Sequence, residues 1–179
     1  MSVHRILEDG SLSKEPLQVV STDERAHAVM TDPAGEFVFV PHTRPNSIHQ
    51  FRFSSERGVF SKDDPALLQR EELSGPRHLW FHPTRPFAFS SDEQGKAITS
   101  YRLSETGTLS VLETVLSFPE DYIEKGSTAD IEVHPSGRFV YIANRGVNTV
   151  AGFAIDPESG GVSLLQQSEV EPVTRSFNI

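Results

Sequence analysis

The feature of this sequence that most constrains its fold is an internal repeat of about 50 residues. The pattern Gly-x-apolar-Ser begins at four glycines spaced 48, 49 and 53 residues apart: Gly10, Gly58, Gly107 and Gly160. A proline recurs at intervals of 50 and 52 residues in the pairs Asp32-Pro33, His82-Pro83 and His134-Pro135. The same two intervals separate alternating apolar runs that begin at Phe37, Phe87 and Phe139, and the segments Ile48–Phe51, Ile98–Tyr101 and Val150–Phe153. Four markers with one period indicate a fold built from repeated units.

Each unit is predicted to contain four short strands. In the first unit the expected strands are Ala26–Thr31, Glu36–Val40, Ile48–Ser54 and Leu67–Leu73. They are separated by a turn at Pro33–Gly35, a loop over Pro41–Ser47 and a turn at Arg57-Gly58, where turn-forming residues interrupt β-branched and aromatic runs. No segment keeps a 3.6-residue apolar period long enough to predict a helix. Four strands in a repeat of this length are typical of a β-propeller blade, so we predict an all-β propeller with four-stranded antiparallel blades.

The number of blades is small for a closed propeller. The 179 residues hold the end of one blade (1–21), three blades (about 26–73, 76–117 and 128–170) and the start of a further blade (174–179). Propellers usually close with four or more blades, which protects the edges of their strands. We therefore expect about half of a propeller, whose open edges need missing blades or self-association to cover them.

Composition excludes several classes of protein. The chain has 16 Lys and Arg against 25 Asp and Glu, and a net charge of −9 argues against a nucleic-acid partner. No apolar run approaches the length of a membrane span, so no membrane partner is expected. The amino terminus lacks the apolar core of a secretory signal, and the absence of cysteine excludes disulfides and thiolate chemistry. We expect a cytoplasmic location, and the seven histidines show no spacing typical of metal ligands.

Comparison of equivalent positions in the repeats identifies candidate functional residues. Six residues before each proline lie His27, Arg77 and Ala129, and ten residues after it lie Thr43, Glu93 and Arg145. The first set opens the innermost strand of its blade, and the second lies in the loop between the second and third strands. In an antiparallel blade these two places share one end of the sheet. We therefore expect His27, Arg77, Glu93 and Arg145 to gather near the central channel, with His78 and Asp130 beside them and Arg175 joining from the next blade.

A group of arginines with one glutamate and one histidine suits an anionic substrate. Arginine binds phosphate or carboxylate through a planar fork, and Glu or His takes a proton from water. Guanidinium groups also stabilise the oxyanion of ester hydrolysis. The alternative is a set of exposed loop charges. Asp32, His82 and His134, which precede the repeated prolines, are interpreted as turn-stabilising residues. The insertion Phe118–Lys125 is either a rim over the pocket or a solvated loop.

Four segments resemble a known family: Pro76–Leu79, Thr128–Ile131, His134–Gly146 and Phe153–Asp156. They are similar to the seven-bladed propeller lactonases, which include bacterial 6-phosphogluconolactonases and fungal carboxymuconate-cyclising enzymes. The resemblance runs essentially end to end, although a full family member has roughly twice this length. It implies a lactonase that opens 6-phosphogluconolactone to 6-phosphogluconate in the pentose phosphate pathway, without a metal or organic cofactor.

The resemblance also implies roles for single residues, because His27, Arg77, Glu93 and Arg145 match the family's proposed site residues. Glu93 or His27 would activate water, and Arg77 and Arg145 would hold the small anionic lactone and its developing oxyanion. Substrate contacts are expected from His78, Asp130, His42 and Arg175. Asp92 competes with Glu93 as the acid, and His42 shares or replaces the role of His27. Two other functions stay open: a muconate-type lactonising enzyme that takes a dicarboxylate, and a non-catalytic propeller that binds a protein partner.

Overall fold

The computed structural model describes residues 1–61, 66–70 and 74–179, in which strands are the only extended regular elements. The first sheet contains β3 (Met30–Thr31), β4 (Phe37–His42), β5 (Ser47–Ser54), β6 (Val59–Phe60) and β7 (Ala66–Gln69). The second contains β8 (Pro76–Phe81), β9 (Phe87–Asp92), β10 (Ala97–Leu103) and β11 (Leu109–Leu116). The third contains β12 (Ser127–Val133), β13 (Phe139–Arg145), β14 (Thr149–Ile155) and β15 (Val162–Glu169). A small sheet pairs β1 (Ser2–Val3) with β2 (Gln18–Val19).

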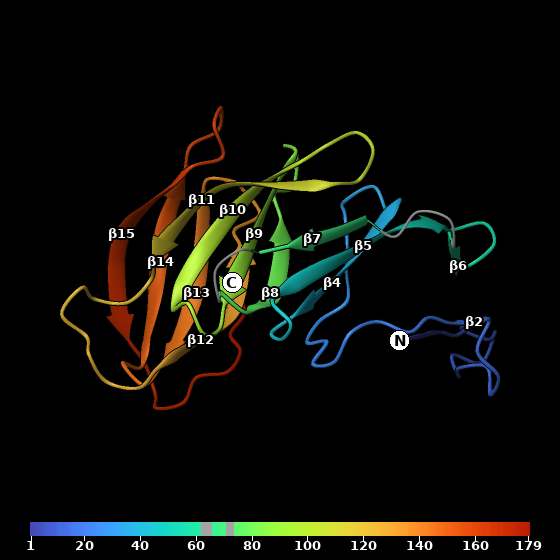
Figure 1. Cartoon of the computed structure of the whole chain (residues 1–179), viewed down its shortest axis with the longest axis horizontal. Coiled ribbons are helices and arrows are strands. Elements are labelled where there is room, and N and C mark those ends of the chain that lie inside the picture. The colour runs from blue at the N-terminus through green and yellow to red at the C-terminus, as the bar shows by residue number, and fades with distance from the viewer. Residues whose placement is uncertain (62–65, 71–73) are drawn as a thin grey trace.

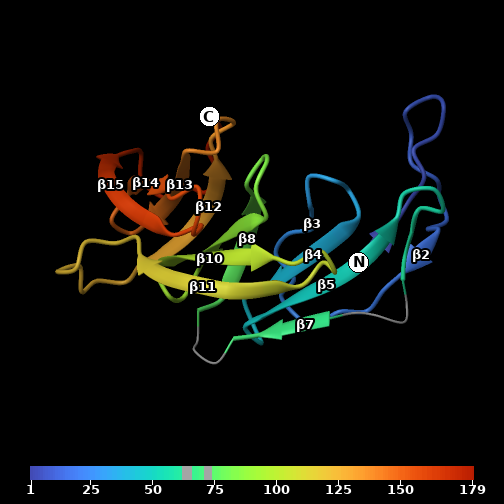
Figure 2. The ribbon, with the colours of Figure 1, turned by 90° about the horizontal axis from the view of Figure 1, so that it is seen from above.

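The three large sheets follow one another in an arc, as Figures 1 and 2 show. In the second and third sheets, each strand pairs antiparallel with the next strand along the chain. The apolar core lies between sheets: one cluster joins Phe89 and Ile98 of the second sheet to Ile131 and Phe153 of the third. The predicted all-β architecture of four-stranded antiparallel blades is confirmed. Within the described residues, no helix is long and apolar enough to cross a membrane.

The first blade departs from the predicted strand bounds. Its innermost strand is reduced to Met30–Thr31 and an isolated pairing of Ala26 with His42. The predicted loop at Pro41–Ser47 is wrong at both ends, because β4 continues through His42 and β5 begins at Ser47. Pro41 has no N–H to donate, but its carbonyl accepts a hydrogen bond from the backbone N–H of His27 (3.0 Å), which holds it in the sheet.

The outer strands of the first blade and the carboxy-terminal segment differ from the prediction as well. The two-residue strand β6 was not predicted, and the described part of the outer strand is Ala66–Gln69. Residues 71–73 of the predicted outer strand lie outside the described residues. Residues 174–179 form no strand. Their backbone N–H groups at Phe177 and Ile179 instead donate to the carboxylates of Asp130 (3.4 Å) and Glu132 (3.2 Å). In the other blades the innermost strand pairs with the second strand of its own blade, and no described residue provides that partner here.

The repeated glycine is explained by contacts between blades. Gly107 and Gly160 have positive φ values of +81° and +77°, and a Cβ at either position would lie closer than 3.0 Å to a phenylalanine ring of the preceding blade. The ring is Phe37 for Gly107 and Phe87 for Gly160. The guanidinium of Arg52 lies 4.7 Å from the Phe37 ring centroid, and that of Arg102 lies 5.0 Å from the Phe87 centroid. The glycine therefore allows each blade to pack closely on its neighbour.

The residues before the repeated prolines stabilise turns, as predicted. Asp32 Oδ1 accepts hydrogen bonds from the backbone N–H groups of Glu36 (2.9 Å) and Phe37 (2.7 Å). His82 Nδ1 accepts them from Thr84 (3.1 Å) and Arg85 (3.0 Å), and His134 Nδ1 accepts one from Ser136 (3.1 Å). A short polar side chain that satisfies the amides after it is a common way to fix a tight turn.

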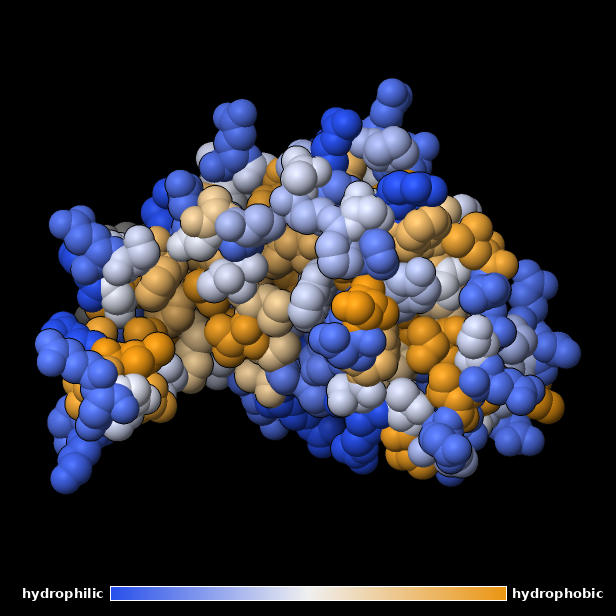
Figure 3. Space-filling model, turned by 180° about the vertical axis from the view of Figure 1, so that it is seen from behind, coloured by the Kyte–Doolittle hydropathy of each residue, from blue (hydrophilic) through white to orange (hydrophobic). Residues whose placement is uncertain are grey.

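The amino-terminal segment packs on the face of the first blade that is turned away from the second blade. Met1, Val3 and Val20 pack against an apolar cluster that includes Phe51 and Phe60. The Gln18 side chain also accepts from the Phe60 backbone N–H (2.7 Å) and donates to its carbonyl (3.1 Å). Apolar side chains reach the surface in several separate places on the rear face in Figure 3.

Candidate functional site

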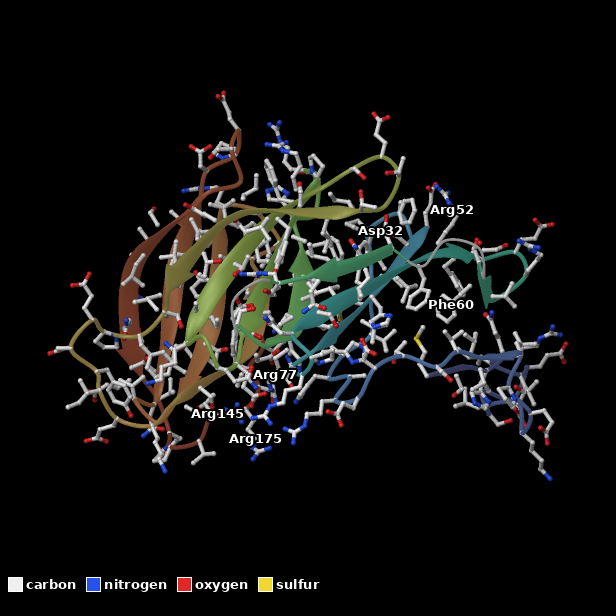
Figure 4. The ribbon with its side chains drawn as sticks, viewed as in Figure 1. Asp32, Arg52, Phe60, Arg77, Arg145 and Arg175 are labelled. Atoms are coloured by element: carbon white, nitrogen blue, oxygen red, sulfur yellow. The ribbon has the colours of Figure 1, made fainter. Side chains whose placement is uncertain are left out.

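Three arginines from different parts of the chain lie together along one edge of the arc, where the second and third sheets meet. Arg77 belongs to β8, Arg145 ends β13, and Arg175 lies in the carboxy-terminal segment. Figure 4 shows the three side chains in one region, whereas Asp32 in the turn after β3 lies away from them. This grouping was expected from the sequence repeat, because residues six before and ten after each repeated proline share one end of their blade.

Irregularities in the innermost strands place residues in this site. The pairing of β8 with β9 shifts between Pro76 and His78, and the pairing of β12 with β13 shifts between Thr128 and Ile131. A bulge leaves a residue out of the ladder and redirects its side chain, and bulges are frequent beside functional sites. Arg77 stands at the first shift and is only 5% exposed.

Glu93 and Arg145 form an ion pair across neighbouring blades. Arg145 Nη2 donates to Glu93 Oε1 at 2.6 Å and to the Thr128 carbonyl at 2.9 Å. The Glu93 backbone is held by a hydrogen bond from its N–H to the Gly75 carbonyl (2.8 Å). Both side chains are partly buried, with 25% of Glu93 and 15% of Arg145 exposed, so water screens the pair less than it screens a surface pair. The structure thus places these two residues in direct contact on one face.

Arg77 has a different environment from Arg145. Among the described residues it forms no ion pair within 4.0 Å, and its Nε and that of Arg145 have no hydrogen-bond partner. Burial, followed by the charge on Arg145, lowers the pKa of Arg77, although Glu93 and Asp130 partly offset the effect. Buried N–H groups without a partner are costly, and an anionic ligand would satisfy them.

Two histidines adjoin Arg77. The ring centroids of His27 and His78 are 5.3 Å apart in an edge-on arrangement. Burial, then the positive charge of Arg77, lowers the pKa of His27, so its imidazole is neutral at neutral pH and able to accept a proton from water. His78 Nδ1 lies 2.7 Å from Asp130 Oδ1. Burial alone would raise the pKa of Asp130, but the hydrogen bond and charge of His78 outweigh it and lower the pKa overall.

His42 and Asp92 lie apart from this group. The buried His42 ring lies 4.8 Å from the His49 ring, and its Nδ1 is 2.9 Å from the Glu24 carbonyl. Asp92 accepts hydrogen bonds from Ser90 and Thr99 (2.7 Å each), and burial raises its pKa. The structure therefore brings Glu93 rather than Asp92, and His27 rather than His42, to the arginines.

The insertion after the second blade borders the turn that follows Arg145. A Cβ on Gly146 would meet the Lys125 carbonyl and the Tyr122 hydroxyl closer than 3.0 Å. Lys96 holds the insertion: its Nζ donates to the Glu124 carbonyl (2.8 Å) and lies 5.4 Å from the Phe118 ring and 5.3 Å from the Tyr122 ring. Sequence reasoning missed Lys96. The available signal was a cation three residues after Glu93 together with an inserted loop that carries two aromatic residues.

The site is built from charged and polar groups. Among the described residues, no group of three or more His, Asp or Glu side chains is arranged to hold a metal ion. The arrangement offers a neutral imidazole, a carboxylate and guanidinium donors, which together can bind an anion and assist the attack of water on an ester.

Comparisons with known proteins agree with this fold. Residues 2–179 match the model of the family described as "Lactonase, 7-bladed beta-propeller". A 6-phosphogluconolactonase of Pectobacterium carotovorum subsp. carotovorum is 28% identical over 100% of this chain and 54% of its own length. One of Cronobacter sakazakii is 28% identical over 97% of this chain and 52% of its own length. The structure of a periplasmic gluconolactonase of Pseudomonas aeruginosa superposes with a TM-score of 0.86, with 27% identity over 95% of this chain and 50% of that one.

The chain spans about half the length of the relatives it matches, which agrees with an arc of about half a seven-bladed propeller. The family model covers nearly every residue, and the strand pattern and blade contacts are those of a propeller. The chain therefore belongs to the lactonase family of seven-bladed β-propellers.

Proposed function

We propose that this chain carries the site of a 6-phosphogluconolactonase, which hydrolyses 6-phosphogluconolactone to 6-phosphogluconate. The observation that carries the proposal is the Glu93–Arg145 pair beside the buried Arg77, which forms no ion pair among the described residues. This arrangement supplies a carboxylate, and cationic donors for both a phosphate and an oxyanion. The names of the curated relatives favour the same substrate. The proposal includes a place in the pentose phosphate pathway and a cytoplasmic location.

The reaction would use these groups in two steps. Glu93 or the neutral His27 accepts a proton from water as its oxygen forms a bond to the lactone carbonyl carbon. The carbonyl oxygen becomes an oxyanion, which the guanidinium of Arg145 stabilises, while Arg77 holds the phosphate. The ring C–O bond then breaks, and the leaving alkoxide takes the proton from the protonated base. The products are a carboxylic acid, which ionises, and a hydroxyl group.

The test is a hydrolysis assay with purified protein, corrected for spontaneous opening of the lactone. Glu93→Gln keeps the size of the side chain but removes a proton acceptor, so we expect a loss of about 100-fold or more in kcat. Arg138→Ala is the matched control, because Arg138 is exposed and packs over Phe139 in a turn outside the arginine group. Folded protein that hydrolyses no phosphorylated lactone would overturn the proposal.

A second candidate substrate is an unphosphorylated gluconolactone. It is favoured by the similarity to the Pseudomonas aeruginosa protein, which is named a periplasmic gluconolactonase. Assaying both lactones side by side separates the two, since only the phosphorylated one needs a cation for its phosphate.

A further inference from the structure

The side chains of Asp130, His78 and Arg77 are joined by hydrogen bonds into a chain that ends at the Arg77 guanidinium. Asp130 Oδ1 lies 2.7 Å from His78 Nδ1, and His78 Nε2 lies 3.3 Å from Arg77 Nη1. The residues come from the innermost strands of two neighbouring blades, β12 for Asp130 and β8 for the other two.

The direction of these hydrogen bonds follows from donor chemistry. A guanidinium can only donate, so His78 Nε2 must be the acceptor and carry no proton. The proton of the neutral ring therefore lies on Nδ1, where it is donated to the carboxylate of Asp130. Asp130 is itself held in place, because its Oδ1 accepts from the Ile131 N–H (3.0 Å) and its Oδ2 from the Phe177 N–H (3.4 Å). The His78 backbone N–H donates to Ser91 Oγ (3.2 Å), which fixes the strand that carries the ring.

The arrangement orients Arg77 without neutralising it. Arg145 is held by the carboxylate of Glu93, so its charge is largely balanced. Arg77 is held by a neutral nitrogen instead, and among the described residues no carboxylate lies within ion-pair distance of it. A guanidinium that is buried, oriented and not balanced by a direct partner retains its charge for an incoming anion.

We propose that Asp130 and His78 are positioning residues that fix the Arg77 guanidinium as the binding group for the phosphate of the substrate. This role differs from the direct substrate contact expected from sequence. It rests on the proposed function only for the identity of the substrate, because the hydrogen-bond chain and the binding of an anion can be measured without turnover. The ionisable groups around these three residues are His27, whose ring lies 5.3 Å from that of His78, the Glu93–Arg145 pair, Arg175 near Arg77, and Glu132 near Asp130.

The first measurement is the tautomer of His78 in the 179-residue protein, observed by long-range ¹H–¹⁵N NMR at a pH where the ring is neutral. We expect the proton on Nδ1 in the wild type. In Asp130→Asn the side-chain amide can donate to Nδ1, so the proton should move to Nε2, as in other Asp-held histidines whose partner is amidated. A wild-type ring protonated on Nε2 would overturn the proposal.

The second measurement is the affinity for inorganic phosphate, by calorimetric titration of the same proteins. Asp130→Asn should weaken binding by about tenfold, the effect expected when an oriented, charge-assisted hydrogen bond is lost. Glu132→Gln is the matched control: Glu132 lies two residues away on β12 and accepts from the Ile179 N–H (3.2 Å) rather than from His78. Both variants remove one negative charge, so electrostatics alone predicts tighter binding in both.

The direction in which the phosphate affinity changes therefore distinguishes positioning from simple electrostatics. Weaker binding in Asp130→Asn with unchanged or tighter binding in Glu132→Gln supports positioning. Equal or tighter binding in Asp130→Asn overturns it, even if the wild type hydrolyses lactone. A wild type that shows the Nδ1 tautomer and binds phosphate but turns over no lactone would count against the proposed function and leave the positioning role intact.

Discussion

Replacing Gly107 by alanine tests whether the repeated glycine holds neighbouring blades together. The change adds a methyl group at a φ of +81° and brings it closer than 3.0 Å to three atoms of the Phe37 ring. The left-handed conformation costs an alanine about 1–2 kcal/mol. The Phe37 ring is buried and the Arg52 guanidinium packs over it. The added contact with this ring costs a further ~1–3 kcal/mol, which is typical of overpacking. We expect the free energy of unfolding to fall by about 2–5 kcal/mol.

Gly35→Ala is the matched control. Gly35 also has a positive φ, +69°, and lies two residues before Phe37, but a Cβ there would meet nothing within 4 Å. Gly35→Ala should therefore lower the free energy of unfolding only by the cost of the left-handed backbone conformation. Both substitutions reduce the conformational entropy of the unfolded chain equally, so this effect cancels in the comparison. The difference between the two variants isolates the contact between blades, at about 1–3 kcal/mol.

The assay is urea unfolding followed by far-UV circular dichroism and by the fluorescence of Trp80, the single tryptophan, which lies in β8. Equal destabilisation by Gly107→Ala and Gly35→Ala would refute the reasoning, because it would show that backbone conformation alone explains the repeated glycine.

Three further predictions follow from the contacts described above. Burial lowers the pKa of His82, so the unfolded chain binds more protons; stability should fall as pH drops below about 6.5, and His82→Asn should remove part of that fall in a series of melting curves. Lys96→Met removes the cation that contacts the Phe118 and Tyr122 rings, so limited proteolysis should cut within residues 118–126 faster than in the wild type. The open edges of the arc should make the protein associate, so its melting temperature should rise with concentration, and a concentration-independent monomeric melt would contradict this expectation.

The repeat made the fold and the gathering of the site predictable from sequence. Spacing alone selected Arg77, Glu93 and Arg145, because equivalent positions in successive blades fall at the same end of each sheet. The contact between Glu93 and Arg145 at 2.6 Å is the direct outcome of that register. The turn roles of Asp32 and His82 were also predictable, since each side chain acts within a few residues of itself.

The direction in which a single side chain points, and the contacts between sheets, were not predictable in this way. His42 was expected in the site, but continued pairing of β4 carries it into the interior beside His49. Asp92 precedes Glu93 directly, yet the alternation of a strand turns it toward Ser90 and Thr99 instead. The Asp130–His78–Arg77 chain depends on how two blades face each other, which local spacing does not specify.

The most direct test of the proposed site compares two lactones in two variants. The ratio of kcat/KM for 6-phosphogluconolactone to that for gluconolactone should be well above one in the wild type and unchanged in Glu93→Gln, where both rates fall together. In Arg77→Ala the ratio should collapse toward one, because the guanidinium that holds the phosphate is gone. A ratio that survives in Arg77→Ala would contradict the account, since the phosphate would then be bound by some other group.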